Sequence, residues 1–139
     1  MASRAELVTR VIRPALLNNQ VVVCDRFLLA SVVYQGHAGG LPIDTLWTMG
    51  HLATSGLSPD LTIVFDLPVD QALTRRGRAA DRMEDRDRDY HERVRTGFLT
   101  EAGHHSETIR IIDASGDEAA VQAAVIDLVQ PLLSKADAL

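Results

Sequence analysis

Apolar residues recur along this chain at spacings typical of helices and strands in turn. Before Asn18 they recur every three or four positions, which predicts an amphipathic helix. The apolar positions of this helix are Leu7, Val8, Val11, Ile12, Ala15 and Leu16. Pro14 falls inside the pattern and is expected to kink the helix or end it early, because proline lacks a backbone N–H.

Three short apolar runs, rich in β-branched residues, predict strands over residues 21–24, 61–67 and 108–113. Helical patterns lie between and after them. They cover residues 28–34, 43–55, Val69–Arg76, 90–102 and the segment that Asp117 can cap. A glycine-rich loop is expected over 36–40, and Gly56 is expected to end the helix over 43–55. The side chains expected to face inward from the last helix are Val121, Ala124, Val125, Leu128 and Leu132.

Strands separated by helices predict an α/β fold with a parallel sheet flanked by helices. Ligands of such folds bind beyond the carboxyl ends of the strands, which here carry Asp25, Arg26, Asp66 and Asp113. Three strands make a thin sheet, so the sequence indicates an incomplete α/β domain. Because no linker or repeat interrupts it, residues 1–139 are expected to form a single domain.

Composition excludes several classes of protein. No segment approaches the roughly 20 apolar residues that cross a bilayer, and the first residues lack a signal-peptide pattern, so neither a membrane protein nor export is expected. The single cysteine, Cys24, agrees with a reducing cytoplasm and is expected to be a small core residue of the first strand. The net charge of −5 argues against a nucleic-acid partner.

Arginines are concentrated in one segment. Between Arg75 and Arg95 eight arginines stand against six acidic residues. Guanidinium groups bind phosphate through a planar fork, so the segment suits a flap that closes over phosphates. A solvated helix face with alternating charges is the other interpretation, and an Arg-biased genome is an alternative source of the arginine excess. Gly77 and the small residues near it suit a flap, but composition does not decide.

Asp25 and Arg26 are the strongest candidate site in the residues themselves. Arg26 can bind a phosphate, and Asp25 can orient Arg26 or lie near a metal ion; a salt-linked pair at a strand end is the alternative. Ser31 and Tyr34 are three residues apart, so on a helix their hydroxyls share a face. The alternative there is an ordinary helix with Tyr34 partly in the core.

Other motifs are weak. The five histidines lack the spacing of metal ligands, and neither a G-x-S-x-G nor a G-x-G-x-x-G motif is present. The glycine-rich loop is not a phosphate loop, because no Lys-Ser/Thr pair follows it.

Four spaced motifs resemble those of bacterial thymidylate kinases. The string VVCDRF at residues 22–27, followed by Ser31 and by YQG at residues 34–36, resembles the family signature DR[YF]…[SN]xxYQG. PDLT at residues 59–62, with Asp66, resembles the PDLT…LD motif. Residues 75–84, which end in DRME, resemble the family's lid with its terminal DRxE. Residues 2–4 and 12–16 resemble the helix that precedes the DR strand.

The resemblance implies a three-layer, P-loop-NTPase-like fold. It also implies transfer of the γ-phosphoryl group of ATP to dTMP with Mg²⁺. By position, Arg26 would hold the dTMP phosphate and Arg4 would contact the nucleotide. Ser31 and Tyr34 would line the base and deoxyribose pocket, where Tyr34 would exclude a 2′-hydroxyl, and Gln35 would belong to the same substrate-binding group.

The resemblance also assigns the transferring end of the site. Asp25 would lie by the metal ion or by Arg26, so that Arg26, Arg78 and Asp25 are the expected catalytic residues. The lid would cover about residues 75–88. Its arginines Arg75, Arg78 and Arg82 would act on the ATP phosphates, while Asp81 and Glu84 would border the substrate.

One departure from the family pattern matters most. The family opens with a strand, a GxxxxGK[ST] loop and a helix, and no such motif occurs in these 139 residues. In the family sheet that strand lies between those predicted here over 21–24 and 61–67, so a central strand is expected to be missing. The chain is therefore expected to have little kinase activity by itself. The family is homodimeric, and residues 2–16 would contribute to the interface.

The alternatives are a non-catalytic paralogue that binds a nucleotide or a partner, and a relative acting on another deoxynucleotide.

Overall fold

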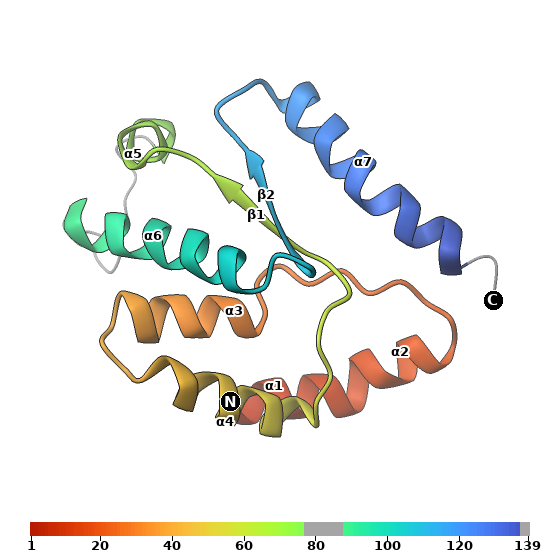
Figure 1. Ribbon diagram of the computed structural model, residues 1–139. Helices are drawn as coiled ribbons and strands as arrows, with labels where there is room; N and C mark the ends of the chain where they lie inside the picture. The colour runs from red at the N-terminus through yellow and green to blue at the C-terminus, as the bar shows by residue number, and fades with distance from the viewer. Residues whose placement is uncertain (77–87, 137–139) are drawn as a thin grey trace. The chain divides into compact units, whose positions relative to one another are not determined.

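The structure of the chain is a computed structural model that describes residues 1–76 and 88–136 (Figure 1). The chain forms two compact units, Met1–Pro59 and Asp60–Leu139, each with its own internal contacts. The expectation of a single domain over residues 1–139 stays a prediction.

The first unit opens with the helical stretch that was predicted before Asn18. It consists of α1 (Ala2–Leu7), a π-helical segment η1 (Val8–Ile12) and α2 (Arg13–Leu17). Pro14 is the second residue of α2 and follows the π-helical segment η1 by two positions. The helical backbone continues through it to Leu17, although proline supplies no N–H to the helix. The helix therefore does not end early at Pro14.

Two further helical stretches complete this unit. The first is α3 (Leu28–Ser31) followed by the π-helical η2 (Val32–His37), and it runs past the predicted end at residue 34. The second, α4 (Ile43–Thr54), confirms the helix predicted over 43–55. Gly56, with φ 75°, donates its N–H to the His51 carbonyl at 2.9 Å, which confirms the predicted glycine stop.

The strand predicted over residues 21–24 is wrong. The backbone there belongs to no strand, and Val21 and Val23 are 67% and 90% exposed. Cys24 is exposed as well, so the expectation of a core cysteine is also wrong. β-branched residues favour extended backbone, but a strand forms only where a neighbour completes its hydrogen-bond ladder. Among the described residues, nothing pairs with this segment.

The second unit holds a parallel pair of strands, β1 (Thr62–Asp66) and β2 (Ile109–Asp113). Its helices are α5 (Val69–Arg76), α6 (Arg88–His104) and α7 (Glu118–Ala136). Figure 1 shows α7 beside β2, on the other side of the strand pair from α6. The parallel sheet flanked by helices confirms the predicted α/β class. The sheet has two strands in the described part of the chain, where three were expected.

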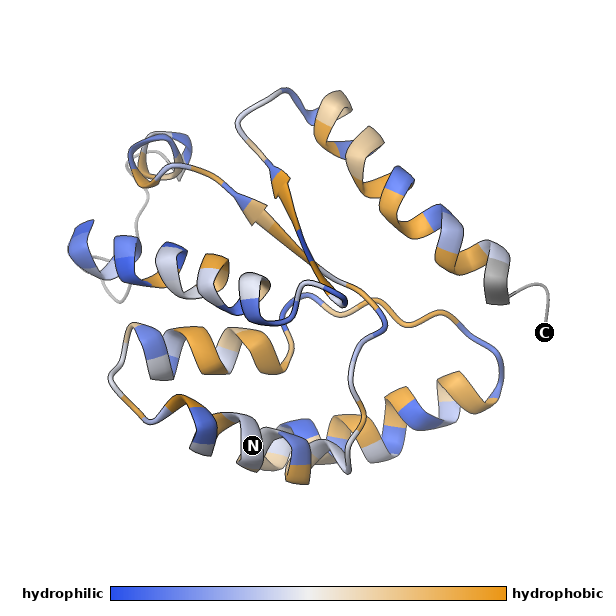
Figure 2. Ribbon diagram, in the orientation of Figure 1, coloured by the Kyte–Doolittle hydropathy of each residue, from blue (hydrophilic) through white to orange (hydrophobic). Residues whose placement is uncertain are grey.

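The core of this unit lies between the strand pair and its helices. Its buried apolar side chains are Val64, Val69, Val94, Ala102, Ile109 and Ile112. Figure 2 shows apolar residues on both strands. The five residues predicted to face inward from α7 are half-buried, and Asp117 caps the helix by accepting the Ala120 N–H at 2.8 Å.

An ion pair joins the end of β1 to α6. Arg95 donates from Nε to Asp66 Oδ1 at 2.7 Å and from Nη2 to Asp66 Oδ2 at 2.8 Å. These bonds hold the pKa of Asp66 below its ordinary value, although partial burial and the nearby Asp113 carboxylate act in the opposite direction. They also raise the pKa of Arg95.

Two glycines let the helices of the first unit approach closely. A Cβ on Gly50 of α4 would overlap Leu28, whose side chain is 4% exposed and belongs to the cluster of Leu28, Val32 and Leu46. A Cβ on Gly36 of η2 would overlap Ile43 and lie 3.0 Å from Leu46 Cδ1. The close spacing of α3, η2 and α4 therefore depends on having glycine, which has no side chain, at these two positions.

Gly50→Ala is expected to destabilise the chain by about 1 to 3 kcal/mol, because Leu28 is too buried to move aside. The control is Gly103→Ala on α6, where an added Cβ meets nothing within 4 Å. That change should raise stability by up to about 1 kcal/mol, because alanine favours helix. Urea unfolding of both variants checks the prediction. A free energy of unfolding that Gly50→Ala leaves unchanged would contradict it.

Asp66→Asn is expected to lower the free energy of unfolding by about 1 to 2 kcal/mol at pH 7. The pKa of Asp66 is lower in the folded state than in the unfolded state. The stabilisation by the ionised carboxylate is therefore complete above the pKa of the unfolded state, and it is lost as the pH falls through the pKa of the folded state. The gap between wild type and variant should thus narrow below about pH 4.

The control for that comparison is Asp70→Asn. It removes a pair with Arg88 whose side chains are 60% and 70% exposed, so the loss should be well under about 1 kcal/mol. Urea titrations from pH 7 to pH 3 measure all three proteins. A gap that stays constant over this range would show that the Asp66 charge does not stabilise the fold.

Candidate functional site

Arg26 occupies a strained position at the end of the extended segment that precedes α3. Its φ is 67°, in the left-handed region that costs a non-glycine residue roughly 1 to 2 kcal/mol. Its Cζ lies 5.6 Å from the centroid of the Tyr34 ring, which places the guanidinium over the aromatic face. The exposed guanidinium and the half-buried Tyr34 ring therefore form one surface of the first unit.

Arg4 reaches the same region from α1. Its Nη2 donates to the Phe27 carbonyl at 3.0 Å and to Ser31 Oγ at 2.9 Å, while Nη1 contacts Met1 Sδ at 3.3 Å. Its Cζ also lies 5.4 Å from the centroid of the Phe27 ring. Burial lowers the pKa of Arg4, because these acceptors are neutral and the guanidinium has lost part of its hydration.

The structure thus brings four of the predicted substrate-binding residues together in the first unit. Arg4 binds Ser31 and Arg26 stacks on Tyr34, while Phe27, the residue directly after Arg26, contacts Arg4. Sequence reasoning assigned no role to Phe27. The aromatic residue directly after Arg26 was the available signal, but nothing in the sequence shows that its carbonyl and ring both receive Arg4.

Asp25 and Gln35 lie on the exposed surface beside this group. The Gln35 backbone carbonyl accepts the Leu41 N–H at 3.0 Å, which closes the turn after η2. Asp25 makes no hydrogen bond or ion pair with another described residue, so its carboxylate is open to solvent. Carboxylate oxygens are ligands that Mg²⁺ accepts in proteins, so the chemistry of Asp25 is compatible with the predicted metal role, which stays a prediction.

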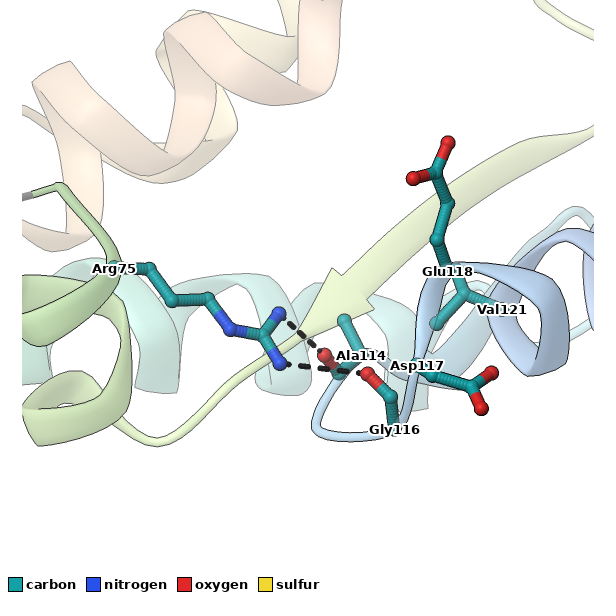
Figure 3. Close-up of a pocket in the computed structure, with 6 residues that line it drawn as sticks. All are labelled: Arg75, Ala114, Gly116, Asp117, Glu118 and Val121. Atoms are coloured by element: carbon teal, nitrogen blue, oxygen red, sulfur yellow. Dashed lines mark hydrogen bonds between the residues drawn. The ribbon is translucent and has the colours of Figure 1, made fainter.

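Arg75 lies at a concavity of the second unit (Figure 3). It donates to the carbonyls of Ala114 at 2.8 Å, Ser115 at 3.2 Å and Gly116 at 3.4 Å. The concavity measures about 470 Å³, and Asp117, Glu118 and Val121 complete its lining. The guanidinium lies against the turn after β2, while the carboxylates of Asp117 and Glu118 point away from it.

The turn after β2 is built for this contact. Asp113, the last residue of the strand, accepts the Ser115 N–H at 2.8 Å, and this bond lowers the pKa of the Asp113 carboxyl. The tight turn that results exposes successive carbonyl oxygens toward Arg75. Sequence reasoning placed Arg75 on phosphates and missed these acceptors, because backbone carbonyls carry no residue-type signal.

The other lid residues predicted to contact ATP or substrate lie outside the described residues; they are Arg78, Asp81, Arg82 and Glu84. Within residues 1–76 and 88–136, no three His, Cys, Asp or Glu side chains are grouped closely enough to hold a metal ion. The helices of this part of the chain are also too short or too polar to span a membrane.

Comparisons of the sequence with protein-family models and with curated proteins point to the same family. The family model described as thymidylate kinase matches residues 1–125. The chain is 46% identical to the thymidylate kinase of Symbiobacterium thermophilum, with 96% of this chain and 63% of that protein covered. It is 45% identical to the thymidylate kinase of Rhodopirellula baltica, with 92% and 53% covered.

A solved structure agrees with these matches. The thymidylate kinase from Ehrlichia chaffeensis superposes with a TM-score of 0.68 at 25% identity, over 91% of this chain and 58% of that one. The likeness confirms a P-loop-NTPase-like fold. The chain spans 63% and 53% of the length of these two curated relatives. By the match over residues 1–125 and by these identities, the chain belongs to the thymidylate kinase family.

Proposed function

We propose that this chain carries the dTMP-binding part and the lid side of a kinase that transfers the γ-phosphoryl group of ATP to dTMP. The observation that supports it most is the convergence of Arg4, Arg26, Ser31 and Tyr34 on one surface. Neither arginine has a carboxylate partner among the described residues, so both can receive an anionic ligand.

Each residue of the first unit would contact the part of dTMP that suits its chemistry. Arg26 would bind the dTMP phosphate, because its guanidinium is exposed and its stack on Tyr34 leaves the fork free. Tyr34 would lie against the deoxyribose and exclude a 2′-hydroxyl. Arg4 and Ser31 would contact the nucleotide as a bonded pair, with Gln35 beside them.

The second unit would hold ATP. The concavity at Arg75 offers a planar guanidinium, fixed by three carbonyls, on which an aromatic base can stack. Arg78 and Arg82 would act on the phosphates, and Asp81 and Glu84 would border the substrate. Members of this family use Mg-ATP. The ion would offset the negative charge of the phosphates, and Asp25 is the protein carboxylate that we assign to it.

We further propose that the protein acts as a homodimer. Leu7 and Val11 are spaced four residues apart on the first helical stretch and are 41% and 55% exposed. Apolar side chains on one exposed helix face suit a contact with the same face of a second copy.

Arg26→Ala is expected to weaken dTMP binding to the 139-residue chain by about 10- to 100-fold, because a charge-assisted phosphate contact is lost. Alanine keeps a Cβ, so the left-handed strain at this position is unchanged. Calorimetry with dTMP and with thymidine measures the effect. Thymidine affinity should not change, since it lacks the phosphate.

The control for this measurement is Arg10→Ala, which removes an exposed arginine paired with Glu6 on α1 and η1. It should leave dTMP affinity as in the wild type. Equal dTMP affinity in the wild type and in Arg26→Ala would remove Arg26 from the phosphate site.

The purified chain is expected to show little or no turnover of ATP and dTMP, because no GxxxxGK[ST] loop is present to cradle the ATP phosphates. A coupled assay for ADP checks this. Ordinary thymidylate kinase turnover would contradict it. Binding of dTMP without turnover would instead favour a role in nucleotide binding, the second candidate function.

A further inference from the structure

The carboxyl edge of the β1–β2 pair carries two carboxylates that the proposed function does not use. Asp66 and Asp113 end neighbouring parallel strands and stand opposite each other in the register. This edge is where ligands of parallel α/β sheets bind. Two adjacent negative charges there would repel a polyphosphate, so a nucleotide triphosphate requires that at least one of them be compensated.

Arg95 supplies that compensation from α6. Its fork occupies both oxygens of Asp66, at 2.7 and 2.8 Å, and the two side chains are only 34% and 21% exposed. Asp113 keeps its charge and uses one oxygen on the Ser115 N–H. The charged groups that act on Asp66 are Arg95 on α6 and Asp113 on β2, while Glu92 of α6 acts on Arg95.

A second arginine–aspartate pair also involves α6 and offers a comparison with the Arg95–Asp66 pair. Arg88 of α6 meets Asp70 of α5 through one oxygen at 2.8 Å, with both side chains mostly exposed. That pair does not lie at a strand end, and solvent screens it. The Arg95–Asp66 pair differs because it is bidentate, is partly buried and lies at the carboxyl end of strand β1.

We propose that Arg95 is a positioning residue for the triphosphate of ATP: by neutralising Asp66 it keeps the carboxyl edge of the sheet open to a polyanion. This rests on the proposed function for the identity of the polyanion. Arg95 acts through Asp66 and need not touch the ligand itself. Removing Arg95 exposes an uncompensated carboxylate pair, and removing the Asp66 charge as well restores the balance.

The test measures binding of ATP and of inorganic tripolyphosphate to the 139-residue chain by calorimetry at pH 7.5. Arg95→Met is expected to weaken both ligands about tenfold. The double variant Arg95→Met/Asp66→Asn is expected to return to within about twofold of wild type. Arg88→Met is the matched control and should bind as the wild type does. A purely structural role for the ion pair predicts no rescue in the double variant.

A second readout is the dependence on pH. Without Arg95, Asp66 loses the bonds that keep it ionised and lies beside Asp113, so it protonates at higher pH. The affinity of Arg95→Met for tripolyphosphate should therefore recover, relative to wild type, as the pH falls toward about 4, where an ordinary aspartate protonates. The double variant should show no such recovery.

If Arg95→Met fails to fold, the single variant Asp66→Asn still tests the inference. This substitution removes the carboxylate partner of Arg95 and leaves Arg95 as an unpaired cation. It should bind tripolyphosphate at least as tightly as wild type, and weaker binding would overturn the inference. So would equal binding by Arg95→Met, an absent rescue, or a wild type that binds neither probe. A chain that shows the rescue but does not bind dTMP would leave this inference standing and overturn the proposed function.

Discussion

The left-handed backbone at Arg26 is the constraint on which the rest of the first unit depends. A guanidinium on an ordinary extended residue would continue the direction of the preceding segment, whereas φ of 67° turns it onto the Tyr34 ring. Such a conformation persists only where the surroundings determine it. Here the next residue, Phe27, is held by Arg4 through its carbonyl and its ring. The close packing of α3 and η2 on α4, which Gly36 and Gly50 permit, fixes Tyr34 in turn.

Several arginines of this chain form hydrogen bonds that link distant segments, in addition to carrying charge. Arg4, Arg13 and Arg75 each donate to backbone carbonyls that lie 23 to 42 residues away along the chain. Arg13 binds the carbonyls of Thr54 and Ser55 at the end of α4, and Arg75 binds three in the turn after β2. A planar fork can satisfy several carbonyls at once, which a lysine ammonium does less well. Part of the arginine excess therefore has a structural cause that neither phosphate binding nor codon usage describes.

The elements that the sequence predicted correctly are those whose signals are local. The helix patterns, the glycine after α4 and the Asp117 cap depend on residues within one or two turns. The strands β1 and β2 were also predicted from local patterns, and they lie in one parallel sheet. Residues 21–24 carry an equally good strand pattern, yet a strand also needs a partner, which a local pattern does not contain. The candidate site divides in the same way, because the resemblance to the family's motifs assigned Arg26 and Tyr34 to one substrate site. The carbonyl acceptors of Arg4 and Arg75 depend on backbone geometry far along the chain.

Charge compensation separates Arg88 and Arg95 from Arg4 and Arg26 and supports different roles for these two sets of arginines. In the second unit, Arg88 and Arg95 are paired with Asp70 and Asp66, so their charges are balanced within the protein. In the described part of the first unit, Arg4 and Arg26 meet only neutral acceptors and aromatic faces. A partly buried cation without a counter-ion is costly, as the lowered pKa of Arg4 reflects. An anion that binds beside Arg4 would recover that cost, and this agrees with the proposal that a phosphate binds in the first unit.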